Sequence, residues 1–209
     1  RPLRIDIKNF KPDKSLRRIL KKNQDIKIEL KKVVVMEQIR SFIAIELNEE
    51  VKQKLRQIQG ILKIPGSDCV KWVEPENIHL TLKFLGNVLA ANIQSIIEVL
   101  RAVAEEVTPF TLEINNPGAF PNLTRVQTIW VGVAGDIKTL HHLQSKLENS
   151  LKKLGYPPEN RNFTPHLTLG RVRDEATLLF RQNLGKVISS TIIESKLTIQ
   201  VETLSLMRS

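Results

Sequence analysis

Apolar and polar residues follow two different periods along this 209-residue chain. Alternation with a period of two, or a short continuous apolar run, is typical of a strand. Such segments occur at 3–7, 40–47, 70–73, 78–85, 110–114, 128–133, 165–169, 191–193, 196–201 and 203–207. Apolar residues three or four positions apart predict helices. They occur at 49–62, 91–107, 137–154 and 175–184.

Polar and small residues mark where several of these elements begin or end. Asn48 and Asp136 stand where helix N-caps are expected, and Gly155 follows a helix where a left-handed residue is favoured. The run 116–118, Asn-Pro-Gly, predicts a turn between two strands. The strand-helix-strand-helix order of the first half returns loosely in the second. We therefore expect an α+β fold of two antiparallel-rich sheets with outer helices and an internal pseudo-two-fold symmetry.

Two of the predicted strands carry nearly the same sequence. Residues 78–82 read Ile-His-Leu-Thr-Leu, and residues 165–169, which place their histidine 87 positions later, read Pro-His-Leu-Thr-Leu. Side chains two residues apart in a strand point to the same face, about 6.5 to 7 Å apart. Each strand would then present a histidine beside a threonine, with its leucines in the core. If the pseudo-symmetry brings the two strands together, they would face one cleft.

His79 and His166, the histidines of these motifs, suit acid and base catalysis on a phosphodiester. Imidazole has an ordinary pKa near ~6.5 and serves as base or acid at neutral pH. Hydrolysis of a 2′,3′-cyclic phosphate needs a base for the incoming water and an acid for the departing ribose oxygen. The hydroxyls of Thr81 and Thr168 would stabilise negative charge on the phosphoryl oxygens. Such a reaction requires no metal and no cofactor.

Other interpretations of the histidines stay open at this point. A single histidine in an apolar strand is more often structural than functional, although its repetition in matching contexts favours function. A zinc site is the competing functional interpretation, but the chain has no His-Glu-x-x-His, no Cys-x-x-Cys and no carboxylate in either motif. The adjacent His141 and His142 point about 100° apart on a helix and lack a hydroxyl partner, so we assign them no catalytic role.

The net charge of +10 is concentrated at one end of the chain. Residues 1–35 hold twelve basic and four acidic side chains, a net of +8. Subtracting these from the totals of 32 and 22 leaves 20 and 18, or +2, for the other 174 residues. The charge argument for RNA binding therefore depends mostly on the N-terminal segment, and the rest of the chain is close to neutral.

Residues 1–35 are predicted to be a basic extension, and residues 36–209 the main domain. The extension reads as a strand at 3–7, a turn at 12–15 and a basic helix through 16–20. It resembles part of the bacterial arginyl- or leucyl-transfer enzymes that use charged tRNA, which would make it a fusion remnant. A solvated basic arm is the alternative, and a third interpretation is that the strand completes a sheet of the main domain.

Several classes of protein are disfavoured by the sequence. The apolar runs are far shorter than the roughly 20 residues that a membrane-spanning helix needs. The charged N-terminal stretch lacks the apolar core of a secretory signal. The single cysteine, Cys69, allows no disulfide within the chain, which fits a reducing compartment. We expect a cytoplasmic monomer that does not bind membranes.

The paired motifs and their flanking segments resemble the 2H phosphoesterase superfamily, and within it the RNA 2′,3′-cyclic phosphodiesterases, also known as 2′,5′ RNA ligases. The resemblance covers about 36–207, and its matching segments are 40–45, 79–86, 118–122, 129–132 and 163–171. It implies two lobes around a metal-free site. It also implies cleavage at the 3′ oxygen of an RNA 2′,3′-cyclic phosphate end, tRNA fragments included, to leave a 2′-phosphate. By the same resemblance His166 is the base and His79 the acid.

The resemblance also implies further contacts with the substrate. The candidates are Arg40, Phe42, Arg125, Phe163 and Arg171. Relatives carry an arginine where this chain has Gln127, and Arg125 is its candidate substitute. They also continue past Ser209 into another strand, so we expect one sheet to lack an edge strand. The alternative function is a module of the same fold that holds an RNA end or nucleotide without turning it over, and ligation beside hydrolysis also stays open.

Overall fold

The computed structural model of the protein describes residues 4–7, 37–194 and 197–209. The predicted turn at 12–15 and the predicted helix through 16–20 lie outside the described residues. The helices are α3 (Glu49–Leu62), α4 (Ile93–Glu105), α5 (Ile137–Lys152) and α6 (Leu178–Ser190). The strands are β1 (Arg4–Ile7), β2 (Gln38–Glu46), β3 (Val70–Trp72), β4 (His79–Leu89), β5 (Phe110–Phe120), β6 (Thr128–Gly135), β7 (His166–Val172), β8 (Thr198–Val201) and β9 (Thr203–Arg208).

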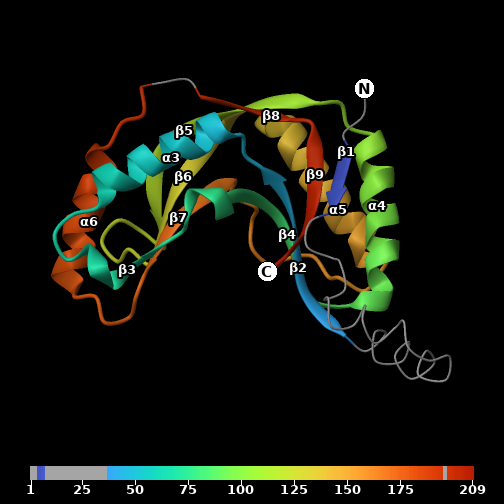
Figure 1. Ribbon diagram of the computed structural model, residues 1–209, viewed down its shortest axis with the longest axis horizontal. Helices are drawn as coiled ribbons and strands as arrows, with labels where there is room; N and C mark the ends of the chain where they lie inside the picture. Colours follow the sequence, from blue (N-terminus) through green and yellow to red (C-terminus); the bar gives the residue numbers. More distant parts are fainter. Residues whose placement is uncertain (1–3, 8–36, 195–196) are drawn as a thin grey trace, which may run out of the picture.

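The strands form one curled sheet with two halves. Its order is β1-β9-β2-β4-β7-β6-β5-β8, and β3 also pairs with β7. Among the described strands, pairing is antiparallel everywhere except between β1 and β9, which are parallel. The halves meet where β4 and β7 share a single ladder position, Leu80 opposite Leu167. The α+β class is therefore confirmed, and the two expected sheets are continuous through the two motif strands (Figure 1).

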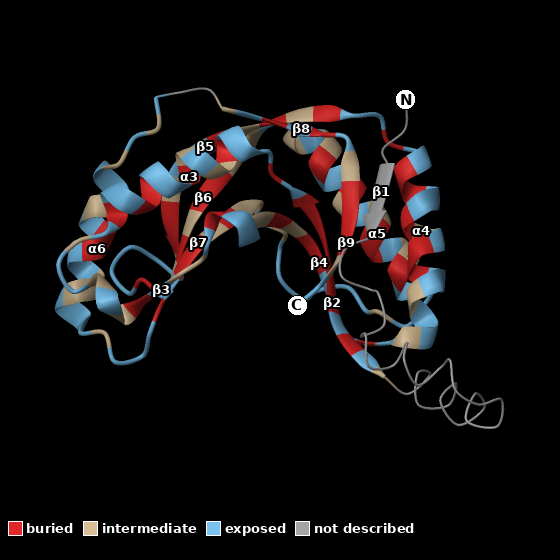
Figure 2. Ribbon diagram, in the orientation of Figure 1, coloured by how far each residue is buried: buried red, intermediate tan, exposed pale blue. Residues whose placement is uncertain are grey.

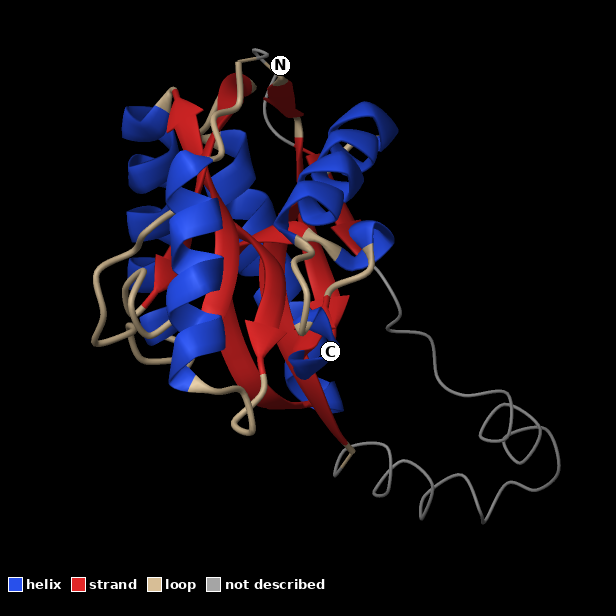
Figure 3. Ribbon diagram, turned by 90° about the vertical axis from the view of Figure 1, so that its left-hand side faces the viewer, coloured by secondary structure: helices blue, strands red, loops and turns tan. Residues whose placement is uncertain are grey.

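The helices cross over between the two halves of the sheet. Helix α3 follows β2 in sequence but lies with α6 over the half formed by β5, β6 and β7 (Figure 1). Helix α5 follows β6 but packs on α4, on the side of β4 and β9. In the view turned by 90°, helices flank the strands on both sides (Figure 3). Each half is thus covered by helices from both halves of the sequence, which makes the two lobes one folding unit.

The buried face of each helix is the apolar stripe that its spacing predicts. Helix α5 buries leucines spaced three or four residues apart, at 140, 143, 147 and 151, all fully excluded from solvent. Figure 2 shows the buried residues where helices meet strands and the exposed residues on the outer helix faces. Leu154, which the same spacing assigns to the core, is instead 37% exposed, because α5 has already ended at Lys152.

The N-caps and the glycine turn are confirmed. The Asn48 side chain accepts the Val51 N–H at 2.9 Å, and Asp136 accepts the Thr139 N–H at 3.1 Å. Gly155 has φ of +87° after α5, in the left-handed region that favours glycine. These predictions depend on contacts within four residues of sequence, which explains why the sequence carries them so clearly.

Two further predictions in the second half of the chain are wrong, and one contact links the two segments. The run 116–118 does not turn; β5 continues through it with an irregular register between Ile114 and Pro117. Residues 191–193, predicted as a strand, follow the end of α6 without regular structure. The Asn116 side chain accepts the Ile193 N–H at 2.9 Å, so the irregularity in β5 turns a polar group toward this connection. The connection is therefore held by a side chain and not by a strand ladder.

Candidate active site

The two motif histidines begin the two central strands and make the same local hydrogen bond. His79 Nδ1 lies 2.8 Å from the Asn77 carbonyl oxygen, and His166 Nδ1 lies 2.7 Å from the Thr164 carbonyl oxygen. Because a carbonyl oxygen only accepts, Nδ1 carries the proton in both rings. Nε2 is then the nitrogen that accepts a proton in a neutral ring and donates one in a charged ring. Each histidine is thus oriented for proton transfer by backbone two residues before it.

Each motif strand contains a β-bulge directly after its threonine. In the ladder between β2 and β4, Thr81 and Lys83 pair with two consecutive residues of β2, so Leu82 is an extra residue without a partner position. In the ladder between β6 and β7, Thr168 and Gly170 likewise pair with two consecutive residues of β6, so Leu169 is the extra residue. A bulge changes which later side chains share a face with those before it. The next side chains on the histidine face are therefore Phe84 and Arg171, at equivalent positions in the two halves.

A cleft of about 730 Å³ lies over the junction of the two motif strands. Its lining combines motif residues with the loop that precedes β7. The lining residues are Thr81, Leu82, Phe84, Phe120, Pro121, Gln127, Thr128, Gln144, Glu159, Arg161, Asn162, Phe163, Thr164, His166, Thr168 and Arg171. Both threonines and one histidine of the motifs therefore face a single space.

The other histidine, His79, lies beside this cleft under an aromatic cover. Its ring stacks on Phe42 with centroids 4.6 Å apart and planes 26° apart. Phe42 also contacts Phe84, which lines the cleft and is 57% exposed. The structure thus brings His79, Thr81, His166 and Thr168 to one region of the sheet.

The remaining predicted contacts divide into two groups. Phe163 and Arg171 line the cleft, as Phe84 does. Arg40 and Arg125 are exposed and lie outside the lining, whereas Gln127 lies within it. The Arg125 N–H bonds the Asn122 side chain in the loop between β5 and β6. Substitution of Arg125 for the arginine of relatives therefore stays a prediction, and Gln127 is the residue that faces the cleft.

The sequence of this chain matches a known family. A family profile described as LigT like phosphoesterase matches residues 45–130 and 131–209. The chain belongs to the LigT-like phosphoesterases. Relatives named RNA 2′,3′-cyclic phosphodiesterase include one from Methanothermobacter thermautotrophicus, 38% identical over 65% of this chain and 72% of that protein. Another, from Aquifex aeolicus, is 32% identical over 68% of this chain and 77% of that protein.

Solved structures carry the same fold as this LigT-like phosphoesterase. A protein of Thermus thermophilus superposes with a TM-score of 0.67 over 82% of this chain and 88% of that chain, at 24% identity. LigT of Escherichia coli, complexed with 3′-AMP, superposes with a TM-score of 0.66 over 83% and 89%, also at 24% identity. At this identity the likeness concerns the fold alone.

The two histidines of this LigT-like phosphoesterase have different surroundings. Burial lowers the pKa of His79, and this effect is larger than the opposing ones from the Asn77 carbonyl and the Glu46 carboxylate. Glu46 lies directly opposite His79 in the β2–β4 ladder and accepts a hydrogen bond from the Ser205 hydroxyl. The His166 ring instead makes T-shaped contacts with two aromatic rings, Phe120 at 5.0 Å and Trp130 at 6.3 Å between centroids. Identical motifs therefore place their imidazoles in unlike environments.

Several cleft residues carry no signal in the sequence. Glu159, Arg161 and Asn162 come from an irregular loop, and Gln144 comes from a helix whose periodicity only marks its apolar side. Nothing in their spacing relates them to the motifs, because the loop reaches the cleft through tertiary contacts. The nearest hint was the position of the three loop residues a few places before the second motif.

Among the described residues, no group of three or more His, Cys, Asp or Glu side chains could hold a metal ion. The described residues therefore offer no metal-binding cluster as an alternative, and the metal-free site stays a prediction. The same described segments contain no helix with the length and apolar character needed to cross a membrane.

Proposed function

We propose that this LigT-like phosphoesterase hydrolyses RNA 2′,3′-cyclic phosphate ends to 2′-phosphomonoesters. The observation that carries the proposal is the meeting of two His-Leu-Thr-Leu strands at one cleft, with both imidazoles oriented by the same Nδ1–carbonyl hydrogen bond. Relatives that align over most of their length are named RNA 2′,3′-cyclic phosphodiesterase, which supports the same activity.

In the proposed reaction the two histidines act on opposite sides of the phosphorus. His166 Nε2 takes a proton from a water molecule, whose oxygen attacks phosphorus and displaces the 3′ oxygen of the ribose. His79, protonated at Nε2, gives its proton to that departing oxygen. The ring opens, the P–O3′ bond breaks, and a 2′-phosphate and a free 3′-hydroxyl remain. Each of these proton transfers is worth on the order of 10² to 10⁴ in rate.

Neutral donors and one cation would stabilise the transition state. The Thr81 and Thr168 hydroxyls line the cleft beside the histidines and can donate to the phosphoryl oxygens. Arg171 follows the bulge of β7 and places a guanidinium group in the same lining. These groups supply the charge stabilisation that a metal ion supplies in other phosphoesterases. We therefore propose that the reaction on the RNA end is independent of metal ions. We also propose that the protein acts as a cytoplasmic monomer.

Turnover of 2′,3′-cyclic AMP tests the proposal. The purified full chain should convert it to 2′-AMP at the same rate with and without EDTA, and 3′,5′-cyclic AMP, which lacks the strained five-membered ring, should remain intact. Formation of 3′-AMP would reverse the assignment of the leaving oxygen. Activity lost in EDTA and restored by zinc or manganese would replace the metal-free mechanism. Saturable binding without turnover would instead establish a module that holds RNA ends.

A further inference from the structure

The strand of the first motif carries a buried charge that the proposed chemistry does not use. Lys83, four residues after His79, is only 1% exposed. The equivalent position in the second motif, four residues after His166, is Gly170, where an added Cβ would lie 3.0 Å from Val70 Cγ1. In the second motif the space beside this position is occupied by Val70 of the neighbouring strand β3, whereas in the first motif it holds the lysine side chain. The motif fold itself does not require a cation here.

The Lys83 ammonium group joins three elements. It lies 2.5 Å from Glu148 Oε2 on α5 and donates to the Pro157 carbonyl oxygen at 2.9 Å. Glu148 is held on its other oxygen by the Gln144 side chain at 3.0 Å. A buried charge is costly unless it is paired and hydrogen-bonded, and Lys83 has both an acidic partner and a carbonyl acceptor. The hydrogen bond from Lys83 to Pro157 connects this network to the segment that follows α5.

That segment, residues 156–165, connects α5 to β7 and is here called the cleft loop. Five of its residues line the cleft: Glu159, Arg161, Asn162, Phe163 and Thr164. It contains no helix or strand, so its position depends on side-chain contacts. Its last residues lead directly into His166, whose Nδ1 is oriented by the Thr164 carbonyl. The placement of the second motif's histidine therefore depends on where the loop is held.

Three contacts tie the cleft loop to the first motif's side of the molecule. Lys83 holds the loop at Pro157, and the neighbouring Phe84 N–H donates to Glu159 Oε1 at 3.3 Å. The Phe163 ring makes a T-shaped contact with His141 on α5, with ring centroids 5.5 Å apart. Direct pairing of the two motif strands amounts to one ladder position, Leu80 with Leu167. The loop contacts are thus a second connection between the strand of His79 and the approach to His166.

We propose that Lys83, with Glu148, is a positioning residue that sets the distance between the two catalytic histidines by clamping the cleft loop to β4 and α5. The proposal depends on the two-histidine function above. Reactions that use two groups at once are sensitive to small displacements, and a shift of about 1 Å can cost about 100-fold in rate. Release of the clamp should therefore act mainly on kcat, which depends on the alignment of the two histidines. Because the loop also lines the cleft, KM should rise as well, but by less than kcat falls.

The test removes the pair as a whole, because removing one partner would leave an uncompensated buried charge. In Lys83→Met/Glu148→Leu, kcat for 2′,3′-cyclic AMP should fall by about 10-fold or more while KM stays within about 3-fold. Lys83→Arg, which can keep the ion pair and the bond to Pro157, should restore most of kcat. The matched control is a more exposed ion pair that also involves α5, Lys146→Met/Glu106→Leu, which should leave kcat unchanged.

Amide hydrogen exchange provides a measurement that does not depend on activity. Loss of the clamp should speed exchange in residues 159–164 by about 10-fold or more while the buried turns of α5 stay within about 2-fold. A folded double variant with wild-type kcat and unchanged exchange in the cleft loop would overturn the proposal. If the wild-type protein hydrolyses no cyclic phosphate, the proposed function fails, and the exchange experiment alone still decides whether the clamp exists.

Discussion

At the scale of single residues, the site consists of two similar histidines in unlike surroundings. Both are oriented by a carbonyl two residues before them, so neither can rotate its ring without losing a hydrogen bond. Burial lowers the pKa of His79 from the ordinary value of an imidazole. A histidine with a lowered pKa is mostly neutral near pH 7, so as an acid it is protonated in only a fraction of the molecules.

Glu46 gives a way to establish which histidine is the acid. Its charge raises the pKa of His79, so Glu46→Gln should lower that pKa further. With His79 as the acid, fewer molecules carry the proton above about pH 6.5, and kcat/KM at about pH 7.5 should fall by at least about 2-fold. The measurement is the pH profile of kcat/KM for 2′,3′-cyclic AMP between about pH 5 and pH 8.

The opposite assignment gives a different profile for Glu46→Gln. With His79 as the base, its neutral form would persist to lower pH, so activity would rise below about pH 6 and stay unchanged at about pH 7.5. Glu46→Asp, which keeps a carboxylate on the same ladder position, serves as the control. A fall at neutral pH that the control does not show identifies His79 as the acid.

The two threonines should matter less than the histidines. Thr81→Val and Thr168→Val each remove a hydroxyl that can donate to a phosphoryl oxygen, and each should cost on the order of 10 to 10³ in kcat. Valine keeps the shape and β-branching, so Tm should change little. Thr→Ser at the same positions keeps the donor and should retain most activity. Equal activity of the serine and valine variants would show that the hydroxyls do not contact the reacting group.

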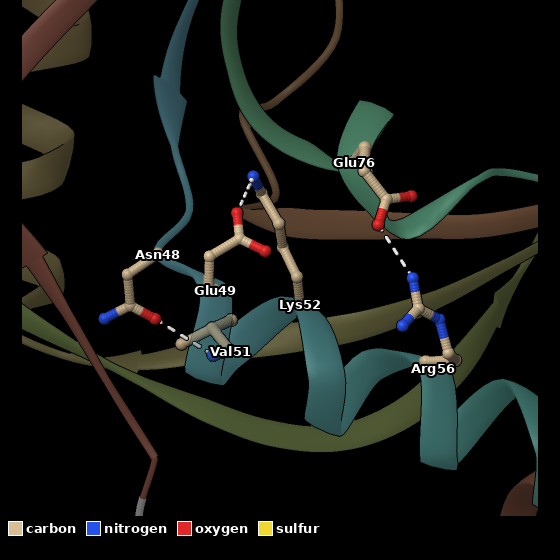
Figure 4. Close-up of polar contacts among 6 residues, drawn as sticks. All are labelled: Asn48, Glu49, Val51, Lys52, Arg56 and Glu76. Carbon is tan, nitrogen blue, oxygen red and sulfur yellow. Dashed lines mark hydrogen bonds and ion pairs between the residues drawn. The ribbon is translucent and has the colours of Figure 1, made fainter.

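At the scale of elements, local contacts set where helix α3 begins and how its surface is paired. Asn48 accepts the Val51 N–H, Glu49 pairs with Lys52 within the first turn, and Arg56 reaches Glu76 in the turn before β4 (Figure 4). The two ion pairs are partly or largely exposed and contribute little. The cap satisfies an otherwise unpaired amide, so it is the contact with a measurable effect on stability.

Asn48→Ala should destabilise the protein without changing catalysis. Losing an N-cap costs about 1 kcal/mol, which corresponds to a Tm lower by roughly 2–4 °C in a chain of this size. Asn48→Asp can accept the same hydrogen bond and should keep Tm near that of the wild type. Thermal unfolding checks the change in Tm, and turnover of 2′,3′-cyclic AMP checks that the site is intact. An unchanged Tm in the alanine variant would mean that water replaces the cap at no cost.

Elements that the sequence predicts well are those set by neighbours in sequence. The caps at Asn48 and Asp136 and both His-x-Thr strands follow from spacing alone. The irregularity of β5 near Asn116 could not be predicted, because it depends on Ile193, 77 positions away. The place of Arg161 in the cleft is likewise set by tertiary contacts of the cleft loop. The sequence therefore identified the two His-x-Thr strands, with Phe163 and Arg171 of the cleft lining, but not Gln144, Glu159, Arg161 or Asn162.

At the scale of the whole molecule, β1 bears on the role of the N-terminal segment. It pairs in parallel with β9, so β9 is not the edge of the described sheet. This is the arrangement expected if residues 3–7 complete a sheet of the main domain. The β9 strand in turn pairs with β2, which carries the Phe42 ring that covers His79. That residues 1–35 form an extension separate from the main domain stays a prediction.

Two truncations separate the strand from the charge. Deleting residues 1–7 removes β1 but only Arg1 and Arg4 of the twelve basic residues, whereas deleting 1–35 removes them all. Both should lower Tm by roughly 4–8 °C, since the paired strand is removed in each. Only the longer deletion should flatten the salt dependence of binding to a long RNA, by a log-log slope of about 0.7 for each phosphate that the segment neutralises. Equal Tm for all three proteins would make β1 dispensable, and equal slopes would exclude the segment from RNA binding.

The central claim is that both histidines take part in one reaction, and turnover of 2′,3′-cyclic AMP by His79→Ala, His166→Ala and the double variant tests it most directly. Each single variant should keep the wild-type Tm within a few degrees and lose at least about 100-fold in kcat. The double variant should be little worse than either, because the two groups act as a unit. A folded single variant that retains more than about a tenth of wild-type turnover would contradict the two-histidine mechanism.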